Sequence, residues 1–174
     1  MTPTTRYPLP ARLLHWITAL LVLAMLALGL AMVDSLADWR RSAIAVHKLC
    51  GMLILLLALA RLGLKPFYRA PPLDDSLPLI QRRIAAISHI LLYALLLALP
   101  LVGLAMQGAA GMPVPLYGPH VLVVPIGENI VLYGWLRAAH SVLGWSLVAL
   151  ATLHILAAVH HAAVRKDGLL RRML

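Results

Sequence analysis

The chain contains little charge, few acidic residues and only one cysteine. Charged residues make up 12% of its 174 positions, whereas about a quarter of the residues in an ordinary soluble domain are charged, so the composition excludes that class. Cys50 is the single cysteine, which excludes an internal disulfide and a Cys-x-x-Cys-His motif for covalent attachment of a cofactor. The six acidic residues all lie outside the long apolar runs of the sequence.

Hydrophobic residues dominate instead, at 62% of the chain, with a mean hydropathy of +0.90. Four apolar runs are each long enough to cross a bilayer as a helix. We therefore expect an all-α transmembrane four-helix bundle that forms a single membrane domain over residues 1–174. The Gly- and Pro-rich connection 107–135 is expected to be an external loop. The runs lie at about 11–33, 43–64, 84–106 and 136–164.

The basic residues flank these runs unevenly, which predicts the orientation of the bundle. Eleven of the fifteen Lys and Arg residues lie on the side that holds both termini, and four lie on the opposite side. By the positive-inside rule both termini are then cytoplasmic. The net charge of +9 is spread over the ends of the runs, so it favours contact with membrane lipid over binding of nucleic acid. The eleven are Arg6, Arg12, Arg61, Lys65, Arg69, Arg82, Arg83, Arg165, Lys166, Arg171 and Arg172.

Two histidines, His140 and His154, stand fourteen residues apart in the last run. On a helix this spacing places both side chains on one face, about 40° apart and separated by roughly 21 Å along the axis. No charged residue lies between them. A hydrocarbon core is about 30 Å thick, so one histidine is expected in each half of the membrane. Ionisable side chains at such depths usually mark a functional site.

The other apolar runs also carry histidines, and the predicted orientation sorts them by depth. His47 lies at the outer level with His140, whereas His15 and His89 lie at the inner level with His154. Haem iron accepts axial imidazoles, and helical bundles build such sites from facing helices. His47 and His140 are the predicted outer pair, while His154 can pair with either His15 or His89. The remaining histidines are His120, in the external loop, and His160 and His161, at the inner interface.

Four of these histidines are followed, one helical turn later, by a small residue. Positions i and i+4 share a helix face, so a flat macrocycle could approach the helix closely there. His89 is followed by Tyr93 instead, whose ring would crowd a porphyrin, and this favours His15 as the inner partner of His154. The small residues are Ala19, Gly51, Gly144 and Ala158.

Several local motifs together resemble the prokaryotic cytochrome b561 family, over nearly the whole chain except the external loop. The two histidines of the last run are also similar to the ligand spacing in the di-haem membrane subunits of hydrogenases and formate dehydrogenases. The motifs are His15-Trp16, His47-Lys48-Leu49-Cys50-Gly51, His89 with Ala98-Leu99-Pro100-Leu101-Val102-Gly103, and His140 with His154-(x5)-His160-His161.

The resemblance implies a protein of the bacterial inner membrane that binds two non-covalent haem b groups and exchanges electrons with ubiquinone. It assigns His15 and His154 to the iron of the inner haem, and His47 and His140 to the iron of the outer haem. His89 is then a companion at the inner level rather than a ligand. Compact members of the family include superoxide oxidases, which pass electrons from external superoxide to ubiquinone, and we expect that activity here.

Basic residues near the outer histidines could attract a small anion such as superoxide. Three acidic residues, Asp34, Asp38 and Glu128, oppose the four basic ones, which leaves a local formal balance of +1. Anchoring of lipid or of haem propionates is the alternative role. The basic residues are Arg40, Arg41, Lys48 and Arg137.

Two other functions are compatible with these residues. The chain could be a cytochrome b subunit that relays electrons between a partner dehydrogenase or cytochrome and the quinone pool, with the external loop as its partner surface. Alternatively, membrane histidines could relay protons or metal ions in a transporter. The absence of Asp and Glu from every apolar run argues against the transporter.

Overall fold

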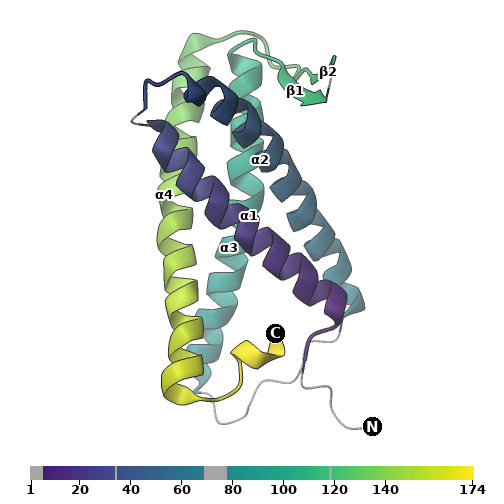
Figure 1. Ribbon diagram of the computed structural model, residues 1–174, viewed down its shortest axis with the longest axis vertical. Helices are drawn as coiled ribbons and strands as arrows, with labels where there is room; N and C mark the ends of the chain where they lie inside the picture. Colours follow the sequence, from purple (N-terminus) through teal and green to yellow (C-terminus); the bar gives the residue numbers. More distant parts are fainter. Residues whose placement is uncertain (1–5, 34, 69–77, 118) are drawn as a thin grey trace.

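The computed structural model contains four long helices that extend along most of its length (Figure 1). Each includes an apolar window long enough to cross a membrane, which confirms the predicted transmembrane four-helix bundle. The structure describes residues 6–33, 35–68, 78–117 and 119–174, so Asp34 and Arg69, which entered the charge counts, lie outside the described residues. The helices are α1 (Leu9–Val33), α2 (Trp39–Leu64), α3 (Leu79–Ala109) and α4 (Ile130–His160).

Helix α4 begins at Ile130, well before the start at 136 that hydropathy indicated. Its first turn is capped by Asn129, whose side-chain oxygen accepts a hydrogen bond from the Leu132 backbone N–H at 2.9 Å. Asparagine is favoured at this position because its side chain satisfies an amide group that has no partner within the helix. The connection between α3 and α4 is therefore shorter than the loop predicted over 107–135.

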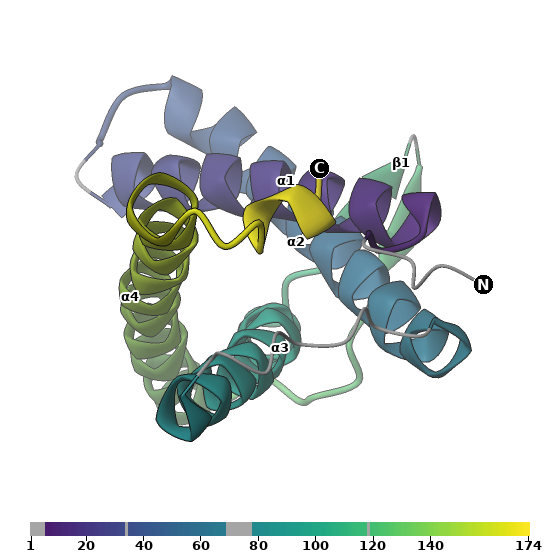
Figure 2. The same ribbon diagram turned by 90° about the horizontal axis from the view of Figure 1, so that it is seen from below.

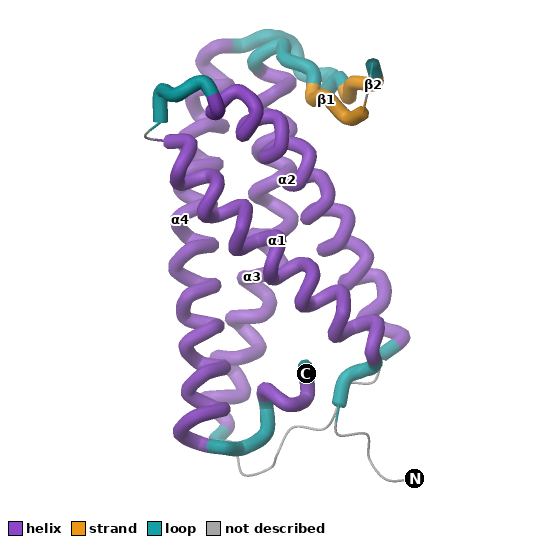
Figure 3. Tube along the Cα trace, viewed as in Figure 1, coloured by secondary structure: helices purple, strands orange, loops and turns teal. Residues whose placement is uncertain are grey.

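The connection between α3 and α4 contains a short antiparallel hairpin that was not predicted. Strand β1 (Val114–Tyr117) pairs with β2 (His120–Leu122), and Val114 lies opposite Leu122. The hairpin lies beside the outer end of α2 (Figure 3), and β1 contacts that helix. Val114 is 1% exposed, which anchors a two-stranded unit that would be marginal alone. His120 is exposed on β2.

Helices that are consecutive in the sequence pack against each other, α1 on α2, α2 on α3 and α3 on α4. Figure 2 looks along the bundle from the end that holds both termini and shows the C-terminal segment lying across that end toward α1. The Tyr7 N–H donates to the Arg172 carbonyl at 3.0 Å, and the Trp16 indole N–H donates to the Met173 carbonyl at 2.6 Å. The two ends of the chain are thus joined at one end of the bundle.

The chain leaves α4 through a turn that reverses its direction. A π-helical turn, η2 (His161–Arg165), is followed by Lys166 and Gly168 with left-handed φ values of 54° and 74°. Glycine adopts this conformation at little cost. A 2.5 Å hydrogen bond joins His161 Nδ1 to the Asp167 carboxylate, which also lies 3.6 Å from Arg165 Nε. These contacts hold the turn, so that the short helix η3 (Leu170–Arg172) comes back toward α1. The other short helix is η1 (Lys65–Phe67), directly after α2.

The buried apolar core lies at mid-height of the bundle, between the outer and inner histidines. All four helices contribute to it, and Leu147 on α4 is seven residues from both His140 and His154. Leu147 is only 4% exposed and Ala58 is fully buried. The core therefore separates the two levels with apolar side chains. Its buried members are Val22, Met25, Ile54, Ala58, Leu96 and Leu147.

Candidate functional site

The outer histidines face each other across the bundle. The ring centroids of His47 on α2 and His140 on α4 lie 6.2 Å apart, with the ring planes at 68°. Because metal–imidazole bonds are about 2.0–2.1 Å long and each ring adds roughly 1 Å, two rings on one metal need centroids about 6 Å apart. The observed separation therefore fits a single iron between the two rings.

Each outer ring carries a buried nitrogen. Nδ1 of His47 and Nδ1 of His140 are inaccessible to solvent, and neither makes a well-aligned hydrogen bond to the described residues, although the backbone of Leu99 interacts with the His140 ring. Buried polar atoms in folded proteins are nearly always paired, so the nitrogen of His47 is the one left without a partner. A metal ion satisfies an imidazole nitrogen, and two facing rings at this separation would suit a haem iron held between them.

Two glycines lie close to the outer rings, whereas the two that follow the outer histidines by one turn border open space. A Cβ at Gly29 of α1 would lie 3.5 Å from the ring of His47, and a Cβ at Gly103 of α3 would lie 3.3 Å from the other ring. Gly29 was not predicted to lie here, and its sequence context does not distinguish it from a packing glycine. A Cβ at Gly51 or Gly144 would meet nothing within 4 Å. The two glycines predicted for close approach of a macrocycle therefore border open space.

At the inner level the structure brings three histidines together. The rings of His89 on α3 and His154 on α4 have centroids 5.5 Å apart, with planes at 68°. His15 on α1 is bonded instead to Arg61 of α2. His15 and His154 are half-buried, whereas His89 is exposed. Of the two candidate partners of His154, the structure thus places the ring of His89 against it, and the assignment of His15 stays a prediction.

Arg61 of α2 also belongs to the inner level, although its charge was counted only for orientation. Its Nη2 donates a hydrogen bond to His15 Nδ1 at 3.1 Å. Arg61 follows His47 by fourteen residues, the spacing that also separates the two histidines of α4. On a helix this spacing puts Arg61 on the same face as His47, about 21 Å further along the axis. The repeated spacing is the sequence signal that could have found it.

The contact with Arg61 determines which nitrogen of His15 is available. A guanidinium donates hydrogen bonds and cannot accept them, so Nδ1 of His15 is the acceptor and a neutral ring carries its proton on Nε2. Histidines that bind metals usually donate their second ring N–H to an acceptor. Binding of iron by Nε2 of His15 therefore requires Arg61 to release Nδ1, whereas the outer pair needs no such change.

The small residues at the inner level, Ala19 and Ala158, are both half-buried.

Tyr93, which follows His89 by one turn, lies with its ring centre 5.3 Å from the Arg61 guanidinium and 5.8 Å from Lys65 Nζ. Both distances fall within the range of cation–π attraction. These two cations hold the phenol ring on the side of α3 that faces α2.

The four basic residues near the outer histidines differ in their surroundings. Arg40 Nε donates to the Met32 carbonyl at 3.1 Å, and so satisfies a carbonyl in the last turn of α1. Lys48 is half-buried beside His47, while Arg41 and Arg137 are exposed. The side chain of Arg40 is therefore bound within the protein, whereas the exposed Arg41 and Arg137 are accessible to a dissolved anion.

A membrane-spanning four-helix bundle with histidines gathered at two depths around an apolar core defines a class of membrane electron-transfer proteins. The family model described as prokaryotic cytochrome b561 matches residues 6–174. The chain belongs to this family, whose cofactor is b-type haem, and it is a multi-pass protein of the bacterial inner membrane.

Three curated relatives match nearly the full chain. Cytochrome b561 homolog 2 of Escherichia coli (strain K12) is 32% identical over 172 residues, which cover 97% of this chain and 91% of the relative. A protein of Yersinia pestis named probable superoxide oxidase CybB is 30% identical over 166 residues, 92% of this chain and 91% of the relative. Cytochrome b561 homolog 1 of Escherichia coli (strain K12) is 31% identical over 170 residues, 92% of each chain.

Proposed function

We propose that the protein oxidises superoxide on the external side of the membrane and reduces ubiquinone through two haem b groups. Two superoxide anions would each lose one electron and leave as O₂. One ubiquinone would take up the two electrons and two protons and become ubiquinol. The likeness to a relative named as a probable superoxide oxidase supports this choice of substrate.

The observation that carries the proposal is the outer histidine pair, whose ring centroids lie 6.2 Å apart, a separation that suits one metal ion between two imidazoles. His47 and His140 would hold the outer haem, and His15 and His154 the inner one. When bound, each haem would supply a one-electron carrier, and two imidazoles holding its iron would favour electron transfer over binding of oxygen.

The protein's own residues would then hold the two haems in place, separate them, and attract superoxide to the outer one. The histidines fix each centre on rigid helices, and the contacts around them tune its potential. The buried core around Leu147 excludes water between the two levels. Both termini would lie in the cytoplasm by the positive-inside rule, so the exposed Arg41 and Arg137 would face external superoxide.

The direct test is a pulse of superoxide applied to the purified, oxidised protein while haem absorbance is recorded. We expect the reduced α-band to form within the pulse, and added ubiquinone to reoxidise it. Superoxide dismutase added beforehand should abolish the reduction. Haems that a ubiquinol reduces but superoxide does not would contradict the proposed donor.

A second function, as a subunit that relays electrons from a protein partner, is favoured by the external connection. Met112, Val121 and Val123 are 58%, 51% and 68% exposed there, outside the four long helices. Exposed apolar side chains outside the membrane-spanning helices can mark a site for a protein partner. If ubiquinol reduced the haems and superoxide did not, the relay of electrons from a protein partner would become the preferred function.

A further inference from the structure

Two cations at the inner end of α2 lie beside the inner histidines. Arg61 donates a hydrogen bond from Nη2 to His15 Nδ1 at 3.1 Å, and Lys65 follows Arg61 by one turn on the same face of the helix. The ring of Tyr93 on α3 lies against both, with its centre 5.3 Å from the Arg61 guanidinium and 5.8 Å from Lys65 Nζ. Tyr93 follows His89, another inner histidine, by one turn. Two positive charges are thus gathered at the inner level.

In the part of the chain that the structure describes, these two cations contact aromatic rings rather than carboxylates. Arg61 meets the rings of His15 and Tyr93, and Lys65 meets the ring of Tyr93. Neither cation forms an ion pair with the described acidic residues. Arg61 is half-buried, and a charge that is partly withdrawn from water is stabilised mainly by an opposite charge. The cluster therefore fits an anion that the described residues do not supply.

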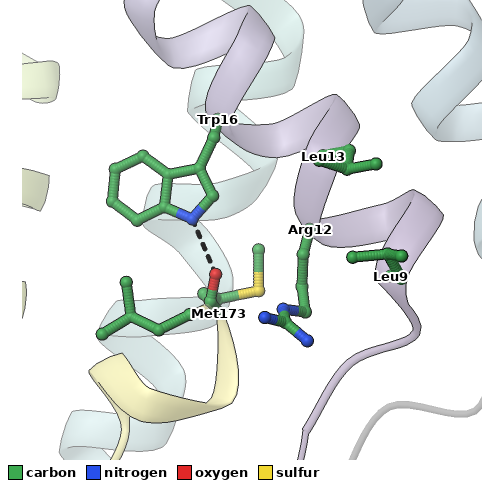
Figure 4. Close-up of a pocket in the computed structure, with 6 residues that line it drawn as sticks. Leu9, Arg12, Leu13, Trp16 and Met173 are labelled. Atoms are coloured by element: carbon green, nitrogen blue, oxygen red, sulfur yellow. Dashed lines mark hydrogen bonds between the residues drawn. The ribbon is translucent and has the colours of Figure 1, made fainter.

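His15 is supported from the side of the C-terminal segment. Its ring lies edge to face with that of Trp16, with centroids 5.4 Å apart and planes at 74°. The Trp16 indole N–H donates in turn to the Met173 carbonyl at 2.6 Å (Figure 4). Arg61 instead has a long side chain with several rotatable bonds. Of the two partners in the 3.1 Å hydrogen bond, Arg61 is therefore the one that moves when a stronger acceptor is present.

We propose that Arg61 and Lys65 bind the carboxylates of the inner haem, and that Arg61 leaves His15 Nδ1 to do so. The inference rests on the proposed two-haem function and adds the residues that hold the acidic groups of one haem. Haem b has two carboxylate side chains, so two cations match them in number and in sign. A charge-assisted hydrogen bond is roughly twice as strong as a neutral one, so the guanidinium exchanges an imidazole for a carboxylate. When Arg61 leaves, the ring proton of His15 moves from Nε2 to Nδ1, and Nε2 is left free to bind a metal.

The phosphate of an anionic lipid is the other anion that could meet these cations. Lipid headgroups are met by exposed cations at the ends of the spans, such as Arg83 and Arg171. Arg61 is half-buried instead, and its hydrogen bond runs to a side chain of another helix, the predicted ligand of the inner haem. This position favours the carboxylate of haem over the phosphate of a lipid.

The first test measures how fast excess apomyoglobin removes haem from the haem-loaded protein in neutral detergent. Arg61→Gln should speed the loss of one haem per chain about tenfold, the effect expected for one hydrogen bond to a charged group, and should leave the other haem unchanged. Lys65→Gln should have a smaller effect because Lys65 is exposed. Arg83→Gln, which removes an exposed charge at the same end of the bundle, is the matched control and should leave both rates unchanged.

The second test observes the carboxylates themselves. Haem labelled with ¹³C in its carboxylates is incorporated during growth, and infrared difference spectra are recorded between the oxidised and the reduced protein. The labelled carboxylate band should shift in Arg61→Gln and stay in place in Arg83→Gln. If Arg61→Gln loses the inner haem before isolation, Arg61→Lys decides, since it keeps the charge and should retain the haem with a displaced band.

Wild-type rates of haem loss in Arg61→Gln would overturn the site. Faster loss with an unshifted carboxylate band, in Arg61→Gln or in Arg61→Lys, would mean that Arg61 acts only through His15, and would overturn it as well. An effect of Arg61→Gln that exists only in vesicles with anionic lipid would assign Arg61 to a phospholipid headgroup. A wild-type protein with a single haem per chain would refute the proposed two-haem function itself.

Discussion

The imidazoles of His47 and His140 come from two helices that are not consecutive, yet their ring centroids lie 6.2 Å apart. Helix α3 packs against both α2 and α4, and so holds the two helices in the positions that align these rings. The outer pair is therefore preformed. At the inner level Arg61 occupies Nδ1 of His15, so we expect binding of the inner haem to displace this arginine.

The first prediction concerns the ligands of the inner haem. His15→Ala should remove the inner haem or convert it to a high-spin form, because one axial bond is lost, and should leave the outer haem intact. His89→Ala should keep both haems low-spin. Optical and electron paramagnetic resonance spectra of the two variants make the comparison. If His89→Ala lost the inner haem and His15→Ala kept it, the 5.5 Å pair of His89 and His154 would be the ligand pair instead.

Replacement of Arg61 should lower the midpoint potential of the inner haem. A positive charge close to the iron stabilises the reduced form, and its removal within a partly buried site is worth on the order of tens of millivolts. A redox titration of Arg61→Leu should show this shift in one component only. Arg83→Leu serves as the control for charge removal at the same end, and equal shifts in both haems would contradict a local effect of Arg61.

Added salt should slow reduction of the haems by superoxide. Exposed charges are screened beyond about 8 Å at physiological ionic strength, and steered association falls accordingly. Arg137→Gln and Arg41→Gln, which remove the two exposed charges, should slow the reduction at low salt by roughly twofold to tenfold, and Lys48→Gln should slow it less. Uncharged ubiquinol should show neither dependence in the same preparation. If the rate of haem reduction by superoxide did not depend on salt, these residues would have no role in electrostatic steering.

The turn after α4 should loosen at acidic pH. Burial raises the pKa of Asp167, but hydrogen bonds from His161 and from the Leu169 backbone, with the positive charge of Arg165, lower it to a net value below the ordinary 3.8. The carboxylate therefore stabilises the turn fully above about pH 3.8, and this contribution is lost as pH falls through the lower pKa of the folded state. Hydrogen exchange of residues 165–174 should rise over that window. Asp167→Asn should already exchange faster at neutral pH and show no further rise.

The bundle and the depths of its histidines were predictable because a bilayer imposes them. About 20 apolar residues are needed for each span, and the rise of a helix converts the spacing of His140 and His154 into depth. The structure places His47 with His140, and His15 and His89 with His154, at the two expected levels. The position of each histidine along the membrane normal could thus be predicted from the spacing of the sequence.

The rotation of each helix about its axis was not predictable in the same way. Lipid is as apolar as the bundle interior, so these helices lack the one-sided pattern that reveals the inner face of a soluble helix. For this reason the approach of Gly103 to His140 and of Arg61 to His15 had to come from the structure. The hairpin was missed because strands of three and four residues carry too little periodicity.

The most direct test of the account is the number of haems that each chain binds. A pyridine haemochrome assay on the purified protein, set against protein concentration from amino-acid analysis, should give close to two haem b per chain. His47→Ala should reduce this ratio to one, because the outer pair of imidazoles would lose one member. A wild-type ratio near one, or a ratio that His47→Ala leaves unchanged, would contradict the two-haem arrangement.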